Sequence, residues 1–280
     1  MYETTYIRAG NLAQAQQLLQ DNPEATLLAG GQTLVLTLRQ RLARPSHVID
    51  IAHLSELKNI SSEGDRLLIG AGTRHADVAT NVEVRRCIPG LAHLAEEIGD
   101  PAVRHMGTIG GSIANSDPAA DYPAAVLGLG ATVHTSQRTI AADDFFTGLF
   151  ETALQRGEII TRVDFPVPRH SGYAKFHQPA SHFALVGVFV AQFADDSVRV
   201  AVTGAGPQVS RASDIEAVLR GNFTAAAAEQ VRISADGLNS DIHASPEYRA
   251  HLIPVFAARA VAAALQSESG SSGPPMIAGG

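Results

Sequence analysis

The chain has 280 residues, of which 45% are hydrophobic and 18% charged, and 21 Lys and Arg against 28 Asp and Glu give a net charge of −7. Because binding to a phosphate backbone requires a basic surface, this balance argues against a nucleic acid partner. The single cysteine, Cys87, excludes an intrachain disulfide and any site built from several cysteines, such as an iron–sulfur site.

Helical and extended patterns alternate through the first half of the chain. Apolar residues recur at helical spacing after Asn11, which can cap this helix, and we expect it to be the first regular element. Asp117-Pro118 has the pattern of another helix start, with an N-cap followed by proline at the first helical position. The other expected elements are strands at 25–29, 48–51 and 66–69 and helices at 34–42, 75–79 and 84–99.

The pattern changes near residue 170, where we expect a domain boundary. Strands are expected at 131–135 and 159–165, before this point. After it, the sequence predicts an antiparallel pair at 183–193 and 198–202, and then helices at 214–219, 224–234 and 245–266. The Gly-, Ser- and Pro-rich residues 267–280 are expected to form a flexible tail. The chain is therefore predicted to be an α+β protein.

The N-terminus lacks a basic start followed by an apolar run, so no signal peptide is predicted. The longest apolar stretch, residues 183–193, is much shorter than the ~20 residues that a membrane helix needs. We expect a soluble cytoplasmic protein without a transmembrane segment.

Two similar glycine-rich loops carry the strongest chemical signal. Paired glycines let the backbone take positive φ and let an anion approach without meeting a Cβ atom, so successive N–H groups can converge on phosphate oxygens. Hydroxyl side chains can add further donors. A pair of tight structural turns is the alternative interpretation. The loops consist of Ala29, Gly30, Gly31, Gln32 and Thr33, and of Thr108, Ile109, Gly110, Gly111 and Ser112.

Other phosphate-binding motifs are absent from the sequence. Neither lysine, Lys58 or Lys175, follows a glycine as a P-loop requires, and no G-x-G-x-x-G opens a helix after a predicted strand. A Rossmann nucleotide site is therefore not expected.

Four segments resemble one family, the FAD-binding medium subunit of the molybdenum hydroxylases, which includes carbon monoxide dehydrogenase, xanthine dehydrogenase and quinoline oxidoreductase. The resemblance runs from near the N-terminus to about residue 220, with the motifs in the order of the family. The segments are LLAGGQTLVLTLRQRLARPSHVIDI (27–51), IGAGTRHADVA (69–79), DPAVRHMGTIGGSIANSDPAADYPAA (100–125) and GEIITRVDFPVP (157–168).

The resemblance implies a fold. Residues 1–170 would form the two-subdomain FAD-binding fold of the vanillyl-alcohol oxidase type, with subdomains at about 1–55 and 56–170. Residues 171–266 would form a small C-terminal domain with a three-stranded antiparallel sheet and helices.

The resemblance also implies a binding site. FAD would lie between the two subdomains, with its diphosphate on the two glycine-rich loops. Asn115 and Asp121 would contact the ribityl or adenosine portion, and Ile160 would pack near the flavin ring or the adenine. A lysine after the domain boundary often approaches the flavin in this family, and Lys175 or His177 matches that position.

The function implied by the resemblance is electron transfer. Electrons would pass from a molybdopterin cofactor on a large subunit, through two [2Fe–2S] clusters on a small subunit, to FAD on this chain. NAD⁺, oxygen or a quinone would be the external acceptor, and the complex would be a dimer of heterotrimers. The alternatives are a self-sufficient small flavin oxidoreductase of the same wider fold and a noncatalytic nucleotide-binding or scaffold protein.

Several other residues have a structural and a functional interpretation. We interpret Asp117 as a helix cap, Cys87 as a small buried hydrophobic residue, and His75 and His105 as solvated or capping residues. Phe183, in the expected loop 178–184, either covers one face of the flavin or is the first core residue of the following strand.

Overall fold

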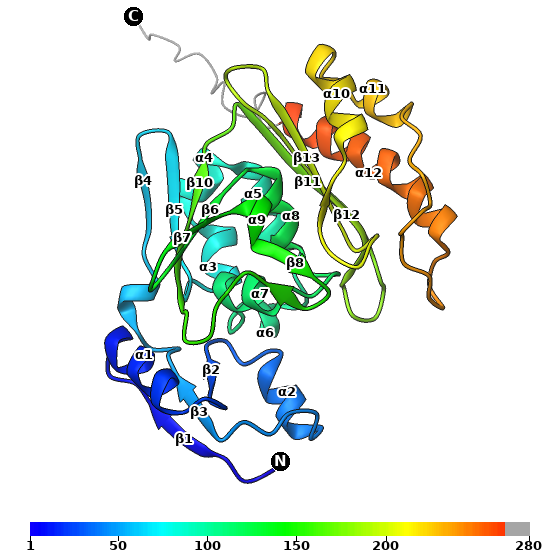
Figure 1. Ribbon diagram of the computed structural model, residues 1–280. Coiled ribbons are helices and arrows are strands. Elements are labelled where there is room, and N and C mark those ends of the chain that lie inside the picture. The colour runs from blue at the N-terminus through cyan, green and yellow to red at the C-terminus, as the bar shows by residue number, and fades with distance from the viewer. Residues whose placement is uncertain (267–280) are drawn as a thin grey trace, which may run out of the picture.

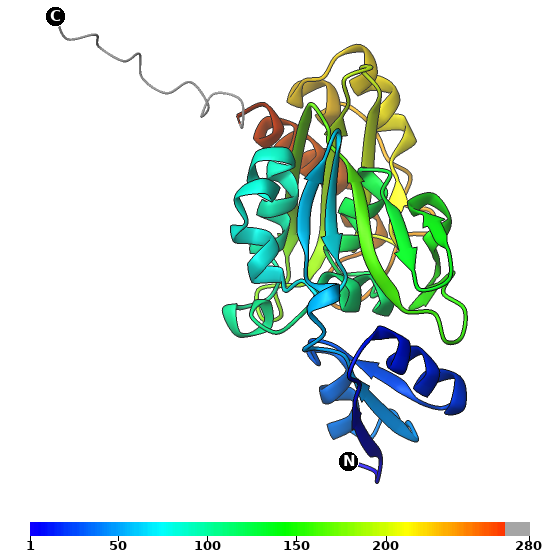
Figure 2. The ribbon, with the colours of Figure 1, turned by 90° about the vertical axis from the view of Figure 1, so that its left-hand side faces the viewer.

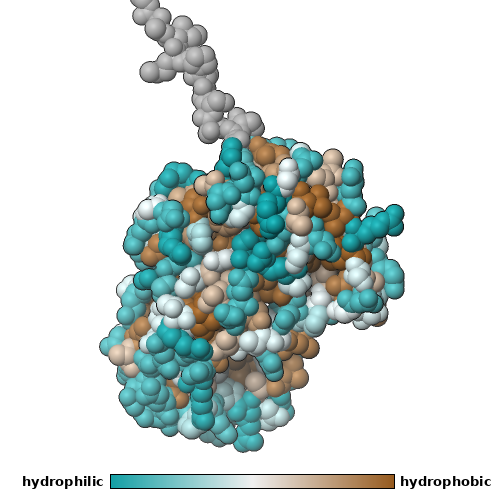
Figure 3. Space-filling model, turned by 45° about the horizontal axis from the view of Figure 1, so that its top comes forward, coloured by the Kyte–Doolittle hydropathy of each residue, from teal (hydrophilic) through white to brown (hydrophobic). Residues whose placement is uncertain are grey.

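The computed structural model describes residues 1–266, which form three lobes, each built around its own apolar cluster (Figure 1). The tail expected at 267–280 lies outside the described residues. Figure 2 shows the N-terminal lobe, β1 to β3, below the rest of the molecule. Polar and apolar residues are interspersed over the face shown in Figure 3, which is consistent with the ordinary composition of the chain.

The N-terminal lobe combines a three-stranded parallel sheet, in the order β1-β3-β2, with two helices. Asn11 caps α1 as predicted, because its side chain accepts the N–H of Gln14. The expectation that α1 comes first is wrong, because β1 precedes it. β1 is largely exposed and has no apolar alternation, so only its pairing with β3 marks it as a strand. The elements are β1 (Thr5–Arg8), α1 (Leu12–Asp21), β2 (Thr26–Leu28), α2 (Leu34–Arg39) and β3 (His47–Asp50).

The central lobe contains a five-stranded antiparallel sheet in the order β4-β5-β10-β6-β7. The strands are β4 (Ile60–Glu63), β5 (Arg66–Gly70), β6 (Thr132–Thr135), β7 (Thr139–Ala141) and β10 (Ile160–Pro166), and a separate hairpin contains β8 (Phe146–Gly148) and β9 (Glu151–Thr152). The helices are the 3₁₀ turn Ser55–Leu57, α3 (His75–Thr80), α4 (Val82–Cys87), α5 (Pro89–Glu96), α6 (Pro101–Arg104), α7 (Ile109–Asn115), α8 (Tyr122–Gly128) and α9 (Ala142–Phe145).

The C-terminal lobe is a four-stranded antiparallel sheet with the helices of this lobe packed on its outer face. Three strands are long, as expected, and the fourth is a two-residue edge strand that the sequence did not predict. Helix α11 ends at Glu229, five residues earlier than predicted. The elements are β11 (His170–His177), β12 (Ala184–Gln192), β13 (Val198–Thr203), β14 (Ser210–Arg211), α10 (Ser213–Gly221), α11 (Ala225–Glu229) and α12 (Pro246–Gln266).

Helices α5 and α8 lie between the two large sheets and join the central and C-terminal lobes. This packing is close at Gly90 in α5, where an added Cβ atom would lie 2.8 Å from the backbone nitrogen of Gly172 in β11. Cys87, at the end of α4, is buried in the central cluster as the sequence predicted. The lobes therefore form one layered body, with the N-terminal lobe attached at one end.

Candidate functional site

The first glycine-rich loop connects β2 to α2 and presents free backbone donors. Within the described residues, none of the N–H groups of Gly30, Gly31, Gln32 and Thr33 donates to a protein acceptor. Gly31 has φ +73°, in the left-handed region that favours glycine. This loop has the arrangement predicted for an anion-binding turn.

The second glycine-rich loop differs from the prediction, because its N–H groups are already used. Ile109 and Gly110 donate to the carbonyl oxygens of Thr73 (3.0 Å) and Ala71 (2.8 Å). Gly111 donates to the side-chain oxygen of Thr108 at 3.2 Å, which caps α7. In this loop, the N–H of Thr108 and the hydroxyl of Ser112 have no hydrogen-bond partner within residues 1–266.

The glycines of the second loop allow close packing within the protein. A Cβ atom on Gly110 would lie 2.6 Å from the Cβ of Ala71, so this glycine lets α7 approach the end of β5. A Cβ atom on Gly107 would lie 2.5 Å from Nε2 of His75. Substitution of Gly110 would therefore disturb the packing of the central lobe whether or not an anion binds there.

The two loops face each other across the junction of the N-terminal and central lobes. A Cβ atom on Gly30 would overlap the carbonyl oxygen of Met106 and lie 2.7 Å from the Cα of Gly107. In Figure 1 the segment from β2 to α2 faces α6 and α7. The two loops therefore lie in close contact at the junction of these lobes.

The residues after α7 form a turn before α8 begins. Asn115 is the last residue of α7, is half-buried, and its side chain makes no hydrogen bond within the described part of the chain. The prediction that Asp117 caps a helix beginning at Pro118 is wrong. Asp117 accepts the N–H of Ala119 at 2.9 Å in a turn, and α8 begins only after Asp121.

Asp121 and Lys175 form a buried ion pair between the central and C-terminal lobes. Lys175 Nζ lies 3.0 Å from Asp121 Oδ1, and the exposed fractions of the two side chains are 1% and 5%. Lys175 also donates to the carbonyl oxygens of Glu97 (2.7 Å) and His182 (2.8 Å). Burial raises the pKa of Asp121, although Lys175 and Tyr173 oppose this by binding the carboxylate. Its Oδ2 atom has no hydrogen bond within residues 1–266.

His177, the alternative to Lys175 as the residue approaching the flavin, lies at the exposed end of β11. Its ring stacks on His182 across the β11–β12 loop, with the ring centroids 5.6 Å apart. The ammonium of Lys175 is fully engaged by protein acceptors, as described above. The structure thus gives the two candidates different environments, one buried and paired, the other exposed.

Phe183 is not a core residue. Its side chain is 46% exposed, and the following strand begins at Ala184, which is buried. The core interpretation from the sequence is therefore wrong, because the loop ends one residue later than the apolar run suggests.

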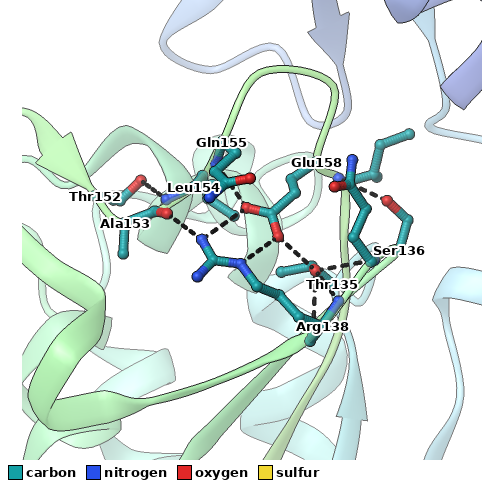
Figure 4. Close-up of polar contacts among 10 residues, drawn as sticks. Thr135, Ser136, Arg138, Thr152, Ala153, Leu154, Gln155 and Glu158 are labelled. Atoms are coloured by element: carbon teal, nitrogen blue, oxygen red, sulfur yellow. Dashed lines mark hydrogen bonds and ion pairs between the residues drawn. The ribbon is translucent and has the colours of Figure 1, made fainter.

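A buried carboxylate orders the chain before β10, where Ile160 lies. Glu158 binds the Arg138 guanidinium, with Oε1 2.8 Å from Nε, and accepts the N–H of Gln155 at 2.6 Å (Figure 4). Ile160 is buried in the central cluster, whereas Ile159 belongs to the cluster of the N-terminal lobe. This short segment therefore packs against both the N-terminal and the central lobe.

Three polar groups behind the second loop were not predicted as buried residues. Thr73 Oγ1, His75 Nδ1 and Tyr122 Oη are buried without a hydrogen-bond partner. The interpretation of His75 as solvated or capping is wrong, since it is 5% exposed and packs 5.3 Å from the ring of Tyr122. Burial and the positive charge of Arg104 lower its pKa to about 4.

Residues 1–266 contain neither a candidate metal centre nor a membrane-spanning helix. No three His, Cys, Asp or Glu residues among positions 1–266 are grouped so that they could hold a metal ion. None of the helices in that part of the chain is long and apolar enough to cross a membrane.

Comparison with known proteins identifies two family regions. Residues 2–168 match the family of the FAD binding domain in molybdopterin dehydrogenase. Residues 171–264 match the family of the CO dehydrogenase flavoprotein C-terminal domain.

Curated relatives match along nearly their whole length. The nicotine 6-hydroxylase medium subunit of Paenarthrobacter nicotinovorans is 34% identical, covering 91% of this chain and 95% of the relative. The carbon monoxide dehydrogenase medium chain of Hydrogenophaga pseudoflava is 31% identical, with 86% and 89% covered.

Solved structures have the same fold. Quinoline 2-oxidoreductase from Pseudomonas putida 86 has a TM-score of 0.85 at 30% identity, covering 95% of this chain and 98% of that one. These matches confirm the resemblance and the fold class expected from the sequence. The chain belongs to the FAD-binding medium subunits of the molybdenum hydroxylase family of oxidoreductases.

Proposed function

We propose that the FAD diphosphate binds to the first glycine-rich loop and that the second loop forms the opposite wall. The observation that carries this proposal is the set of four unpaired N–H groups at Gly30–Thr33. Such groups bind phosphate oxygens without a nearby cation. From the second loop, the N–H of Thr108 and the hydroxyl of Ser112 add two donors. The other residues of the two loops, Ala29, Ile109, Gly110 and Gly111, shape this cleft.

The remainder of the cofactor would follow the cleft in two directions from the diphosphate. Asn115 and Asp121 offer an amide and a free carboxylate oxygen to the hydroxyl or ring N–H groups of FAD. Ile160 supports an apolar part of the cofactor. Lys175 acts through Asp121: its ammonium holds the carboxylate in place rather than contacting the flavin, and His177 remains the exposed alternative.

The bound FAD would receive electrons from clusters on another chain and pass them to an external acceptor. The composition supports a location of the clusters on another chain, since one cysteine cannot ligate an iron–sulfur cluster. The relatives are named as medium subunits or chains, and one as a subunit of a dehydrogenase complex. The partners would be a small iron–sulfur subunit and a large molybdopterin subunit, in a cytoplasmic dimer of heterotrimers.

A domain division at 170 would accompany this function, with FAD bound by residues 1–170 and the domain of residues 171–266 closing the flavin end. Several contacts support such a role. The turn at Pro118–Ala120 accepts hydrogen bonds from Thr203, Gly204 and Ala184 of the C-terminal lobe.

Affinity purification of the full chain from its own cells tests this function. We expect it to bring down one iron–sulfur and one molybdopterin subunit, and we expect the flavin to be bleached anaerobically only when both are present and the substrate is added. A self-sufficient flavin enzyme would instead show turnover with the chain alone. Turnover without partners would overturn the proposal.

A further inference from the structure

A pocket of about 520 Å³ lies between the central and C-terminal lobes, and no residue of the two glycine-rich loops lines it. Most of its lining comes from the turn at 117–119, the β11–β12 loop, and the coil that leads into α12, and the β8–β9 hairpin and α12 add one residue each. In Figure 1 this loop and this coil lie at the lower right, beside the hairpin that contains β8. The turn at 117–119 lies between Asn115 and Asp121, so the pocket shares a wall with the proposed flavin end of the cleft.

Two aromatic side chains stand at this pocket. Phe150, in the turn of the β8–β9 hairpin, is 56% exposed, and Phe183 is 46% exposed. Two partly exposed phenyl rings from different lobes are suited to hold a planar ring, because aromatic rings attract each other in stacked or edge-to-face arrangements.

The charged groups of the pocket leave a net negative charge. Arg249 is 2% exposed, and its charge is balanced by Asp241, whose Oδ2 lies 2.6 Å from Nη2. Arg249 also donates to the carbonyl oxygens of Leu185 and Gly204. Asp117 has no cationic partner in the described part of the chain, and only one of its oxygens accepts a hydrogen bond. An anionic ligand would therefore be repelled.

Arg249 does not present a free donor to a ligand, because its unpaired Nε is itself buried. The ligand preference of the pocket therefore depends on its two aromatic rings and on its charge.

From these features we propose that this pocket binds an uncharged planar aromatic electron acceptor of the quinone type, and that its acidic lining disfavours an anionic dinucleotide. This inference rests on the proposed function, since it places an acceptor beside bound FAD. A quinone held here would take up two electrons and two protons and leave as the hydroquinone, and FAD, when bound and fully reduced, would supply both.

The test measures binding to the full chain loaded with FAD, so that the cofactor cleft is filled. The probes are 1,4-naphthoquinone and its 2-sulfonate, which have the same ring but differ by one negative charge. By equilibrium dialysis at low ionic strength, we expect the neutral probe to bind about tenfold more tightly than the sulfonate. NAD⁺ should bind more weakly than either.

Two substitutions locate the binding. Phe150→Ala should weaken binding of the neutral probe about tenfold without changing the melting temperature, and Phe183→Ala provides a second, independent variant. Asp117→Asn keeps an oxygen for the N–H of Ala119, removes the charge, and should reduce the preference for the neutral probe to about threefold or less. Asp144→Asn, at an exposed position outside the pocket, is the matched control and should change nothing.

The outcomes separate this inference from the proposed function. If the chain does not bind FAD, the proposed function fails before the test begins. If it binds FAD but the naphthoquinone does not bind, or binds equally well in both Phe variants, the inference is overturned and the function remains. Equal affinity for the neutral and sulfonated probes would also overturn it.

Discussion

The pairing of Lys175 with Asp121 has a measurable stability consequence. Both side chains are almost completely buried, so Lys175→Met would leave a carboxylate buried without its counter-ion. We expect Lys175→Met to lower the free energy of unfolding by about 3–5 kcal/mol, measured by urea denaturation.

A double variant provides the control for this pair. Asp121→Asn/Lys175→Met removes both charges while the amide oxygen can still accept from the hydroxyl of Tyr173. It should therefore be more stable than Lys175→Met alone. If the effects of Asp121→Asn and Lys175→Met on the free energy of unfolding simply add in the double variant, the two side chains are not energetically coupled.

His75 makes the stability of the fold depend on pH. The unfolded imidazole takes up a proton near pH 6.5, whereas the folded one stays neutral down to about 4. The unfolded state therefore binds more protons between these values. Stability contributed by neutral His75 is complete above about pH 6.5 and is lost as pH falls toward about 4.

Replacing His75 with leucine isolates this contribution. Between about pH 7 and about pH 4.5, the wild-type chain should lose roughly 2–3 kcal/mol more stability than His75→Leu. Chemical denaturation at the two pH values measures the difference. Identical losses would show that His75 is not the buried neutral group described above.

At the scale of elements, the segment before β10 depends on one carboxylate. Hydrogen bonding to Arg138 lowers the pKa of Glu158, so its contribution is present above the ordinary carboxyl pKa and is lost as the pH falls below it. Glu158→Gln keeps the shape of the side chain and its contacts with Thr135 and Gln155 but weakens the bond to Arg138. We expect it to lower the unfolding free energy by about 2 kcal/mol.

Removing Arg138, the partner of Glu158, gives a second variant for comparison with Glu158→Gln. Arg138→Met leaves a fully buried carboxylate without its cation and should cost more than Glu158→Gln, about 3 kcal/mol. Thermal unfolding of the two variants at neutral pH provides this ranking. The opposite order would mean that the segment is held mainly by the backbone contacts around Ser136 and Ile159.

The elements that the sequence predicted well have strong local signals. Strand β12 was predicted from its apolar run, which reflects burial on both faces of the strand. Helix α1 was predicted from the helical spacing of the apolar residues after Asn11, which reflects burial on one face. β1 was missed because its exposed residues become a strand only through pairing with β3, more than 35 residues away. Such a contact has no local signature.

The sequence predicted the two loops of the candidate site but not the tertiary contacts of their backbone. Composition alone indicated two glycine-rich loops, but it could not show that the N–H groups of Gly110 and Gly111 are used within the protein. That distinction depends on how closely Ala71 approaches, which is a tertiary property. The burial of His75 and the exposure of Phe183 depend equally on neighbours distant in sequence.

At the scale of the whole molecule, the C-terminal lobe holds two segments of the central lobe that the proposed FAD site uses. Its strands hold the turn at Pro118–Ala120, and its Lys175 holds Asp121. The lobe that carries no glycine-rich loop is therefore bonded directly to residues proposed to contact the cofactor. We expect changes in the C-terminal sheet to alter the flavin environment even at positions that do not touch the cofactor.

FAD binding by the first loop, through its free N–H groups, is the feature on which the proposed function depends most. The most direct measurement is the FAD content of the purified full chain after desalting, for the wild type, Gly30→Ala and Gly111→Ala. An added methyl group at Gly30 overlaps the Met106 carbonyl, whereas at Gly111 it meets only the Thr108 hydroxyl oxygen, at 3.0 Å. We predict roughly one FAD per chain in the wild type and in Gly111→Ala, and at least a tenfold weaker affinity in Gly30→Ala, about 1.4 kcal/mol. A colourless wild-type chain would contradict FAD binding by the first loop. Full FAD retention in Gly30→Ala with loss in Gly111→Ala would contradict it as well.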